Sequence, residues 1–172
     1  CIQCNQCAYV CPHATIRPFA MTEDEAAAAP ETTRMLDAMG PKAKGMKFAI
    51  VVSPLDCMGC TNCAKVCPKG ALEMVPAEQE IDQQPIWDYM VENVSEKKEL
   101  IAANVKGSQF KQPYLEFSGS CAGCAETAYA RLVTQVAGDR MFISNATGCS
   151  SIWGNPAATA PYCKDKDGHG PA

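Results

Sequence analysis

The sequence predicts an α+β fold in which a small cysteine-rich domain precedes the first part of an α/β domain. Residues 1–12 and 57–68 carry the same pattern of four cysteines and a closing proline, C-x2-C-x2-C-x3-C-P, which predicts the first part. From residue 114 onward, short apolar runs flank one long helical pattern, which predicts the second. With 172 residues, 47% of them hydrophobic and 20% charged, the chain has the composition of a globular protein.

The repeated cysteine pattern indicates two 4Fe–4S clusters. Three closely spaced thiolates of such a loop bind one cluster, and the fourth binds the other cluster of the pair. Zinc sites or disulfides would rarely produce two complete copies of the pattern. The two-cluster rule predicts crossed ligand sets, which are Cys1, Cys4, Cys7 and Cys67 for the first cluster, and Cys57, Cys60, Cys63 and Cys11 for the second.

An insertion at residues 18–46 is expected between the two loops. The repeats lie 56 residues apart, which is more than two adjacent cluster loops need. Thr22 and Glu25 form a capping-box pattern before an alanine run, which indicates a helix. Pro30 and Gly40 fit the start and the end of a second helix, with Met35, Leu36 and Met39 on its apolar face. The insertion is therefore predicted to be a helical hairpin.

The first domain is expected to span residues 1–76 and to end in a small sheet. Lys47–Pro54 is rich in β-favouring residues and predicts a strand that enters the second loop. Ala71–Val75 is predicted to be the closing strand. Residues 77–113 are interpreted as an interdomain linker with one amphipathic helix, formed around Pro85, Ile86, Met90 and Val94, on which Trp87 and Tyr89 act as packing anchors.

Residues 114–172 predict one β-α-β crossover of a parallel sheet. Strands are expected at Tyr114–Phe117 and Met141–Ser144, on either side of a helix at Ala125–Val136. Ligands of such sheets bind beyond the carboxyl ends of the strands. Two cysteine-containing segments lie at those ends, and they hold Cys121, Cys124 and Cys149. The apolar face of the predicted helix consists of Ala128, Leu132, Val133 and Val136.

The cysteines of this second part allow three interpretations. Cys121 and Cys124 form a C-x-x-C pair at a helix N-terminus, which is also found in redox dithiols and in zinc sites. Cys149 follows the next predicted strand and would return to the same sheet edge. Three converging thiolates in a chain with two predicted clusters favour a third 4Fe–4S site, one ligand of which lies outside this chain.

Composition and pattern argue against several other functions. The net charge is −4 and no basic patch stands out, so no nucleic-acid partner is expected. No apolar run approaches the roughly 20 residues of a membrane span, and ligand thiolates must stay reduced, which favours a cytoplasmic location. The two histidines, His13 and His169, are interpreted as structural or solvated, which leaves Ser-His-Asp chemistry without support.

Several segments of the chain together resemble the pyruvate:ferredoxin (flavodoxin) oxidoreductases. They are Cys-Ala-Gly-Cys-Ala-Glu-Thr at 121–127, Gly-Asp-Arg-Met-Phe-Ile at 138–143, Asn-Ala-Thr-Gly-Cys-Ser-Ser-Ile-Trp-Gly at 145–154, and Lys-Gly-Ser-Gln-Phe at 106–110. The resemblance covers nearly the whole chain. It implies a fragment made of a bacterial-type two-cluster ferredoxin-like domain and, at residues 114–172, a partial thiamine-diphosphate-binding domain.

The resemblance also implies an activity and roles for particular residues. The parent enzyme (pyruvate synthase) converts pyruvate and coenzyme A to acetyl-CoA and CO2, and three 4Fe–4S clusters carry the electrons to ferredoxin or flavodoxin. Cys121, Cys124 and Cys149 match three ligands of the third cluster, and Glu126 and Cys149 match contacts of thiamine diphosphate. Cys163 matches nothing and is expected to be a spare thiol. A homodimer is implied by analogy.

The same resemblance sets limits on this chain. The family's Gly-Asp-Gly…Asn-Asn stretch, which holds Mg2+ and the diphosphate, has no counterpart here, so the chain alone is not expected to be catalytically complete. Two alternatives stay open, namely a stand-alone bacterial-type ferredoxin electron carrier and the ferredoxin module of another 2-oxoacid oxidoreductase. Residues 121–154 discriminate against the plain carrier, which has no need of them.

Overall fold

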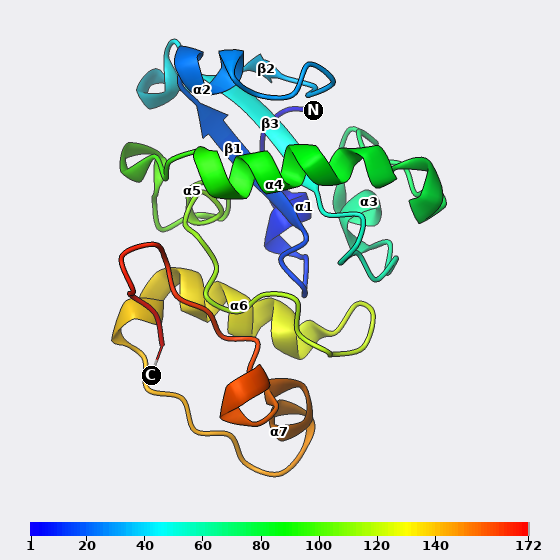
Figure 1. The fold of residues 1–172 in the computed structure, drawn as a ribbon, viewed down its shortest axis with the longest axis vertical. Coiled ribbons are helices and arrows are strands. Elements are labelled where there is room, and N and C mark those ends of the chain that lie inside the picture. The colour runs from blue at the N-terminus through cyan, green and yellow to red at the C-terminus, as the bar shows by residue number, and fades with distance from the viewer. Residues whose placement is uncertain (172) are drawn as a thin grey trace.

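The computed structural model describes residues 1–171 and contains one antiparallel sheet with short helices around it (Figure 1). Strand β3 (Lys47–Val52) lies between β1 (Ile16–Met21) and β2 (Leu36–Asp37). The β1–β3 ladder runs from the pair Ile16 and Val52 to the pair Met21 and Lys47. The predicted strand at 47–54 is confirmed over Lys47–Val52. Its β-branched and aromatic side chains suit a pleated, half-buried surface.

Helix α4 (Gln84–Asn93) covers one face of the sheet and confirms the helix predicted in the linker. Its buried side chains form the main apolar core with residues of β1 and β3. Trp87 is 4% exposed and meets Phe19 of β1 edge to face, with ring centroids 6.5 Å apart, so its predicted role as a packing anchor is confirmed. The core consists of Met21, Ala49, Val51, Ile86, Trp87 and Met90.

The two cysteine loops each lead into a short helix, α1 (Gln6–Tyr9) and α3 (Asn62–Val66). The two helices contact each other, and they start 56 residues apart in the sequence, as the two cysteine motifs do. The expected internal repeat is therefore present in the structure as well as in the sequence. Helix α2 (Glu23–Ala27) begins at Thr22 with a complete capping box, which confirms the first helix of the insertion.

The second helix predicted for the insertion, between Pro30 and Gly40, is wrong. This segment contains β2, which pairs with Phe48 and Lys47 of β3. The side chain of Gln3 fixes the segment to the first cysteine loop, because it donates to the Asp37 carbonyl and accepts from the Met39 N–H, at 2.7 Å each. Tertiary hydrogen bonds of this kind outweigh the weak helical preference of a short segment.

The closing strand predicted at Ala71–Val75 is also wrong. These residues belong to no strand, and Met74 and Val75 are each 39% exposed. Their backbone groups pair with no strand of the sheet, and the Ala71 N–H donates to the Cys67 Sγ instead.

The β-α-β crossover predicted after residue 114 is wrong for the described residues. Tyr114–Phe117 and Met141–Ser144 form no strands, and Leu115 makes only an isolated antiparallel bridge with Tyr162. Neither segment has a parallel neighbour to satisfy its backbone groups. The predicted helix between them is confirmed as α6 (Ala125–Ala137), and a short helix, α7 (Cys149–Gly154), follows.

The buried face of α6 is polar, which the sequence did not suggest. Its buried residues are Thr127, Arg131, Thr134 and Gln135, whereas Val133 and Val136 of the apolar stripe are 47% and 63% exposed. The helix packs on α5 (Val105–Ser108) and reaches the end of α1. None of the helices in residues 1–171 combines the length and the apolar character that a bilayer crossing requires.

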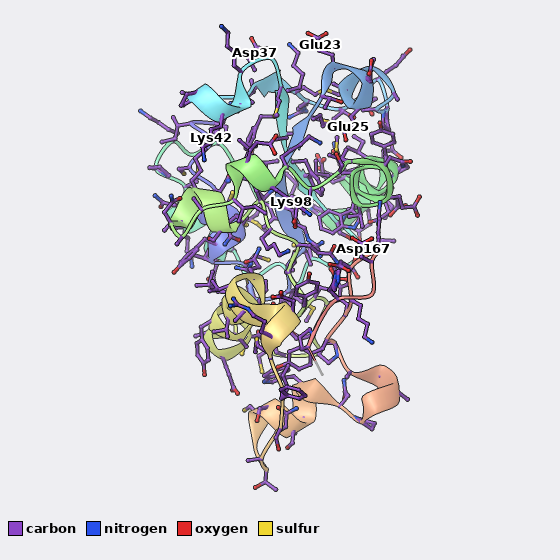
Figure 2. All side chains as sticks on the ribbon, turned by 90° about the vertical axis from the view of Figure 1, so that its left-hand side faces the viewer. Glu23, Glu25, Asp37, Lys42, Lys98 and Asp167 are labelled. Atoms are coloured by element: carbon purple, nitrogen blue, oxygen red, sulfur yellow. The ribbon has the colours of Figure 1, made fainter. Side chains whose placement is uncertain are left out.

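A partly buried ion pair joins the insertion to the segment after α4. Besides capping α2, Glu25 accepts hydrogen bonds from the Lys97 Nζ, at 2.7 and 3.0 Å, and from Ser95 (Glu25 and Lys98, the neighbour of Lys97, are labelled in Figure 2). Burial alone would raise the pKa of Glu25, but these bonds and the Thr22 N–H hold it at about 2. Glu25 is therefore ionised at neutral pH.

Replacing Lys97 by methionine is expected to lower the free energy of unfolding by about 1–3 kcal/mol, because the Glu25 carboxylate loses its charged partner. Denaturant unfolding at neutral pH under anaerobic conditions measures the change. Lys98→Met is the matched control, since Lys98 is exposed, and its effect should stay within about 0.5 kcal/mol. Equal losses in the two variants would contradict the role of the pair.

Candidate metal centre

The backbone of the two cysteine loops repeats residue by residue. Three positions of the first loop have positive φ angles, although none is glycine, and the positions 56 residues later have them too. Such angles cost about 1–2 kcal/mol per non-glycine residue, so the surrounding structure has to enforce them. The pairs are Gln3 and Gly59 (55° and 65°), Asn5 and Thr61 (59° and 68°), and Ala14 and Gly70 (57° and 55°).

The eight cysteines of the two loops line two cavities. A cavity of about 840 Å³ is lined by Cys1, Cys4, Cys7 and Cys67, together with Cys57 and Cys63. A smaller one is lined by Cys57, Cys60, Cys63 and Cys11. Each cavity thus contains one complete crossed set, including the distant fourth cysteine. This grouping supports the crossed ligand sets, which stay a prediction.

The thiols of the two sets also act on one another electrostatically. Burial, together with the neighbouring thiols Cys63, Cys4 and Cys67, raises the pKa of Cys7 to about 11 against one backbone hydrogen bond. Burial also raises the pKa of Cys63, followed by Cys11, Cys57 and Cys60. Crowded, buried thiolates are unfavourable until cations bind them, so this donor set fits a site that is completed by metal.

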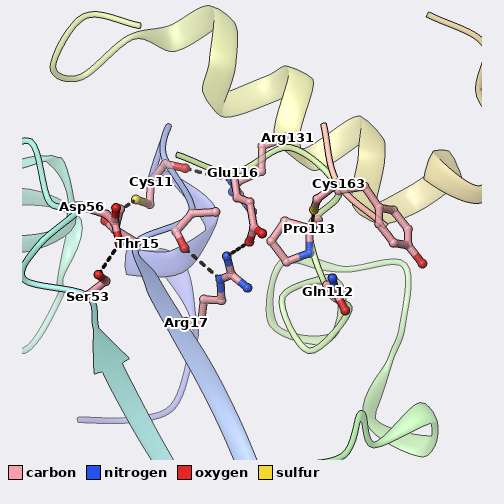
Figure 3. A network of polar contacts seen from close by, with 12 residues as sticks. Cys11, Thr15, Arg17, Ser53, Asp56, Gln112, Pro113, Glu116, Arg131 and Cys163 are labelled. Carbon is pink, nitrogen blue, oxygen red and sulfur yellow. Dashed lines mark hydrogen bonds and ion pairs between the residues drawn. The ribbon is translucent and has the colours of Figure 1, made fainter. Parts of the chain in front are cut away.

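Hydrogen-bond donors also point at the sulfur atoms. The Ala71 N–H donates to the Cys67 Sγ at 3.2 Å and is the main cause of the lowered pKa of that thiol. At the equivalent place in the first loop, the Thr15 hydroxyl lies 3.5 Å from the Cys11 Sγ (Figure 3). Hydrogen bonds to cluster sulfur atoms are one of the factors that set the reduction potential.

Two residues that line the cavities each have a buried polar atom without a partner among residues 1–171. They are His13 at the smaller cavity, through its Nε2, and Thr33 at the larger one, through its Oγ1. Buried polar atoms normally have partners, and cluster sulfur atoms accept hydrogen bonds. The surroundings of both cavities therefore fit iron–sulfur clusters. His13 is structural in that its Nδ1 lies 3.1 Å from the Ser118 carbonyl, but it is not solvated.

The third cysteine group lies directly beside the second loop. A Cβ added at Gly123, between Cys121 and Cys124, would be in ordinary van der Waals contact with the Cβ of Cys60, at 3.5 Å. Its φ of 76° also favours glycine. Cys149 is the first residue of α7 and is exposed, and it lines neither of the two cavities. Convergence of the three thiols remains a prediction.

Cys124, the N-cap of α6, lies in a buried cluster of hydroxyl groups. The Ser120 hydroxyl is 2.9 Å from that of Thr127, and Ser118 continues the chain to His13. Burial acts to raise the pKa of Cys124, but hydrogen bonds from Thr127, the Glu126 N–H and Ser120 outweigh it and lower the pKa. Such a thiol is suited to metal ligation or to redox chemistry. Glu126, the predicted thiamine-diphosphate contact, is in the first turn of α6 and half-buried.

One buried residue beside the first cysteine loop was not indicated by the sequence. Arg131 of α6 is 2% exposed and donates hydrogen bonds to three carbonyl groups of the first cysteine loop. Figure 3 shows the bond to the Cys11 carbonyl. Burial lowers the pKa of Arg131 to about 10, while the Cys11 thiolate acts against this shift, so the side chain stays charged at neutral pH. A single arginine on a helix gives no signal of such a role in the sequence.

Comparison with known proteins defines the class of this chain. A family model described as a 4Fe-4S dicluster domain matches residues 1–71. Residues 1–71 therefore match a two-cluster iron–sulfur domain, as the repeated cysteine motif predicted.

The relatives of the chain are more specific. It is 57% identical over 175 residues to the pyruvate:ferredoxin oxidoreductase of Moorella thermoacetica and 51% identical over 174 residues to the pyruvate-flavodoxin oxidoreductase of Klebsiella pneumoniae. Each match covers 100% of this chain and 15% of the relative. The mitochondrial pyruvate dehydrogenase [NADP(+)] of Euglena gracilis is 49% identical, over 10% of its length. Over its whole length, the chain is similar to one segment of the pyruvate:ferredoxin (flavodoxin) oxidoreductases, which confirms the resemblance.

Replacement of Cys163 by serine is expected to leave the iron content unchanged. This thiol lines neither cavity, and it donates to the Pro113 carbonyl at 3.5 Å. Burial, followed by Glu116, raises its pKa to about 12, so the thiol is neutral at neutral pH. Iron and sulfide analysis after anaerobic purification provides the measurement. Cys7→Ser is the matched control and should reduce both. Loss of iron in Cys163→Ser would show that this thiol is not spare.

Proposed function

We propose that the chain is the electron-transfer segment of a pyruvate:ferredoxin (flavodoxin) oxidoreductase, which oxidatively decarboxylates pyruvate to acetyl-CoA and CO2. The observation that carries the proposal is the pair of cavities, each lined by one crossed set of four cysteines. Identity to such enzymes over the whole chain supports the assignment. Since the chain spans about 15% of these relatives, activity, substrates and partners are inferred for the longer protein.

The residues of this chain would hold the groups that transfer single electrons. Bound 4Fe–4S clusters supply one-electron oxidation and reduction at potentials that the surrounding protein adjusts. The protein contributes the cysteine ligands, the N–H and hydroxyl groups near the sulfur atoms, and the spacing between sites. The proposed ligands are Cys1, Cys4, Cys7 and Cys67 for the first cluster, Cys57, Cys60, Cys63 and Cys11 for the second, and Cys121, Cys124 and Cys149 for the third.

The packing supports an order for the three sites. The Gly123 loop of the third group lies beside Cys60 of the second set, within reach of a Cβ added at Gly123. The second cluster would therefore lie between the third and the first, and the first cluster would pass electrons to ferredoxin or flavodoxin.

Other parts of the proposal rest on the relatives and on the resemblance. Thiamine diphosphate with Mg2+ and coenzyme A would act in the longer protein, with Glu126 and Cys149 close to the thiamine. A cytoplasmic homodimer is the form we infer. A stand-alone ferredoxin carrier is disfavoured, because Arg131 of α6 is buried and donates to carbonyls of the first cysteine loop, and a plain carrier has no such helix. The ferredoxin module of another 2-oxoacid oxidoreductase would differ in substrate only.

Anaerobic reconstitution should give about eight iron atoms and eight sulfides per chain for the two complete clusters. After reduction with dithionite, the EPR spectrum should show two magnetically interacting clusters, because their cavities adjoin. Acetyl-CoA formation from pyruvate in the longer protein tests the activity separately. Bound zinc in place of iron, or intact dithiols without metal, would contradict the proposal.

Paired replacements test the crossing of the ligand sets. Cys67→Ser should remove about four of the eight iron atoms, and adding Cys4→Ser should remove no more, because both ligands belong to one cluster. Adding Cys60→Ser to Cys67→Ser should remove nearly all the iron. If instead Cys4→Ser removed the remaining iron and Cys60→Ser removed no more, each loop would hold its own cluster with all four of its cysteines.

A further inference from the structure

Arg131 is a buried cation without a carboxylate partner. None of the ion pairs within residues 1–171 includes it, although its side chain is 2% exposed. Arg17, the nearby arginine, differs because it is paired with Glu116. Burial of an uncompensated charge is expensive, so a cation in this position requires an anion close by.

All the hydrogen bonds of Arg131 go to neutral oxygen atoms. Its Nε donates to the Cys11 carbonyl at 2.9 Å, and its Nη2 donates to the carbonyls of Ala8 and Tyr9 at 3.0 and 2.7 Å. Its Nη1 donates to the side-chain oxygens of Gln109 and Gln135 at 3.1 and 2.5 Å. These bonds satisfy the guanidinium donors but leave its positive charge uncompensated.

The position of Arg131 points to the missing anion. The carbonyls that it binds belong to residues 8–11, directly after Cys7. Cys7 is a predicted ligand of the first cluster, and Cys11 is a predicted ligand of the second. Of the predicted ligands, Cys11 is the one whose own carbonyl accepts a hydrogen bond from Arg131. A cluster held by four thiolates carries net negative charge, and its potential depends on that charge. A fixed cation close to it favours the reduced state, because reduction adds one more negative charge and no proton.

We propose that Arg131 is the counter-ion of the cluster bound by Cys57, Cys60, Cys63 and Cys11, and that it raises the reduction potential of this cluster. The helix that starts at the third cysteine group thus contributes a charge to the cluster beside it. The inference rests on the proposed pair of clusters. A purely structural clamp would predict lower stability without a selective change in potential.

The primary test compares Arg131→Met with the wild-type chain in anaerobic redox titrations followed by EPR, after iron and sulfide analysis of both proteins. Each cluster takes one electron from the reductant. In the variant, the reduced-to-oxidised ratio of one cluster at a fixed potential should fall about tenfold. This corresponds to a midpoint potential that is lower by about 59 mV. This is the size expected for a unit charge roughly 10 Å away at an effective permittivity near 20. The affected cluster should be the one that Cys11→Ser also changes.

Two further variants separate the charge from the packing. Gln135→Glu keeps Arg131 in place but sets a carboxylate against its Nη1, so it should lower the same midpoint potential. Arg131→Lys keeps the charge and loses the forked hydrogen bonds, so its midpoint should stay close to that of the wild type. Arg140→Gln is the matched control, because it removes a cation that is 73% exposed just beyond α6, and it should change neither midpoint.

Unchanged midpoints in an Arg131→Met protein with full iron content would overturn the inference, as would an equal shift in the lysine variant. If the Arg131→Met protein loses its iron, the Gln135→Glu variant provides the test. An unchanged midpoint potential in Gln135→Glu would then overturn the inference. A wild-type chain that binds no iron would instead refute the proposed function, and this inference with it.

Discussion

The confinement of eight thiols in two adjoining cavities is the constraint on which the rest of this structure depends. Buried thiols resist ionisation, as the raised pKa values of Cys7 and Cys63 illustrate, and neighbouring thiolates would repel one another. Metal cations relieve both costs, so folding and metal binding are expected to be linked. The sheet, α4 and the ion pair of Glu25 with Lys97 provide a rigid frame for the two loops.

The two cysteine loops share the same backbone conformation at equivalent positions. Positive φ angles recur at equivalent positions, and in the first loop they fall on Gln3, Asn5 and Ala14, where glycine would be easier. Strain at such sites persists only where tertiary contacts maintain it. Gln3 and Asn5 supply those contacts, because their side chains bind Asp37, Met39 and Lys106, which lie far along the sequence.

Helix α6 connects the third cysteine group to the two-cluster domain through an unusual interface. Its buried face is built from hydroxyl, amide and guanidinium groups, while much of its apolar stripe is exposed. Buried polar groups are stable only when their bonds are satisfied, and the carbonyls at the end of α1 satisfy those of Arg131. The interface thus places a fixed charge and a chain of hydroxyls between sites that are proposed to exchange electrons.

Local signals in the sequence, namely cysteine spacing, capping residues and periodicity, predict the cluster-binding loops, the capped helix α2, the strand β3 and the helices α4 and α6. They do not reveal that residues 30–40 contribute the strand β2, that 71–75 form no strand, or that 114–117 and 141–144 build no parallel sheet. Strand formation depends on pairing with another strand, which no local pattern encodes. For the same reason Arg131 and His13 gave no signal, since their roles arise from contacts with residues that are distant in the chain.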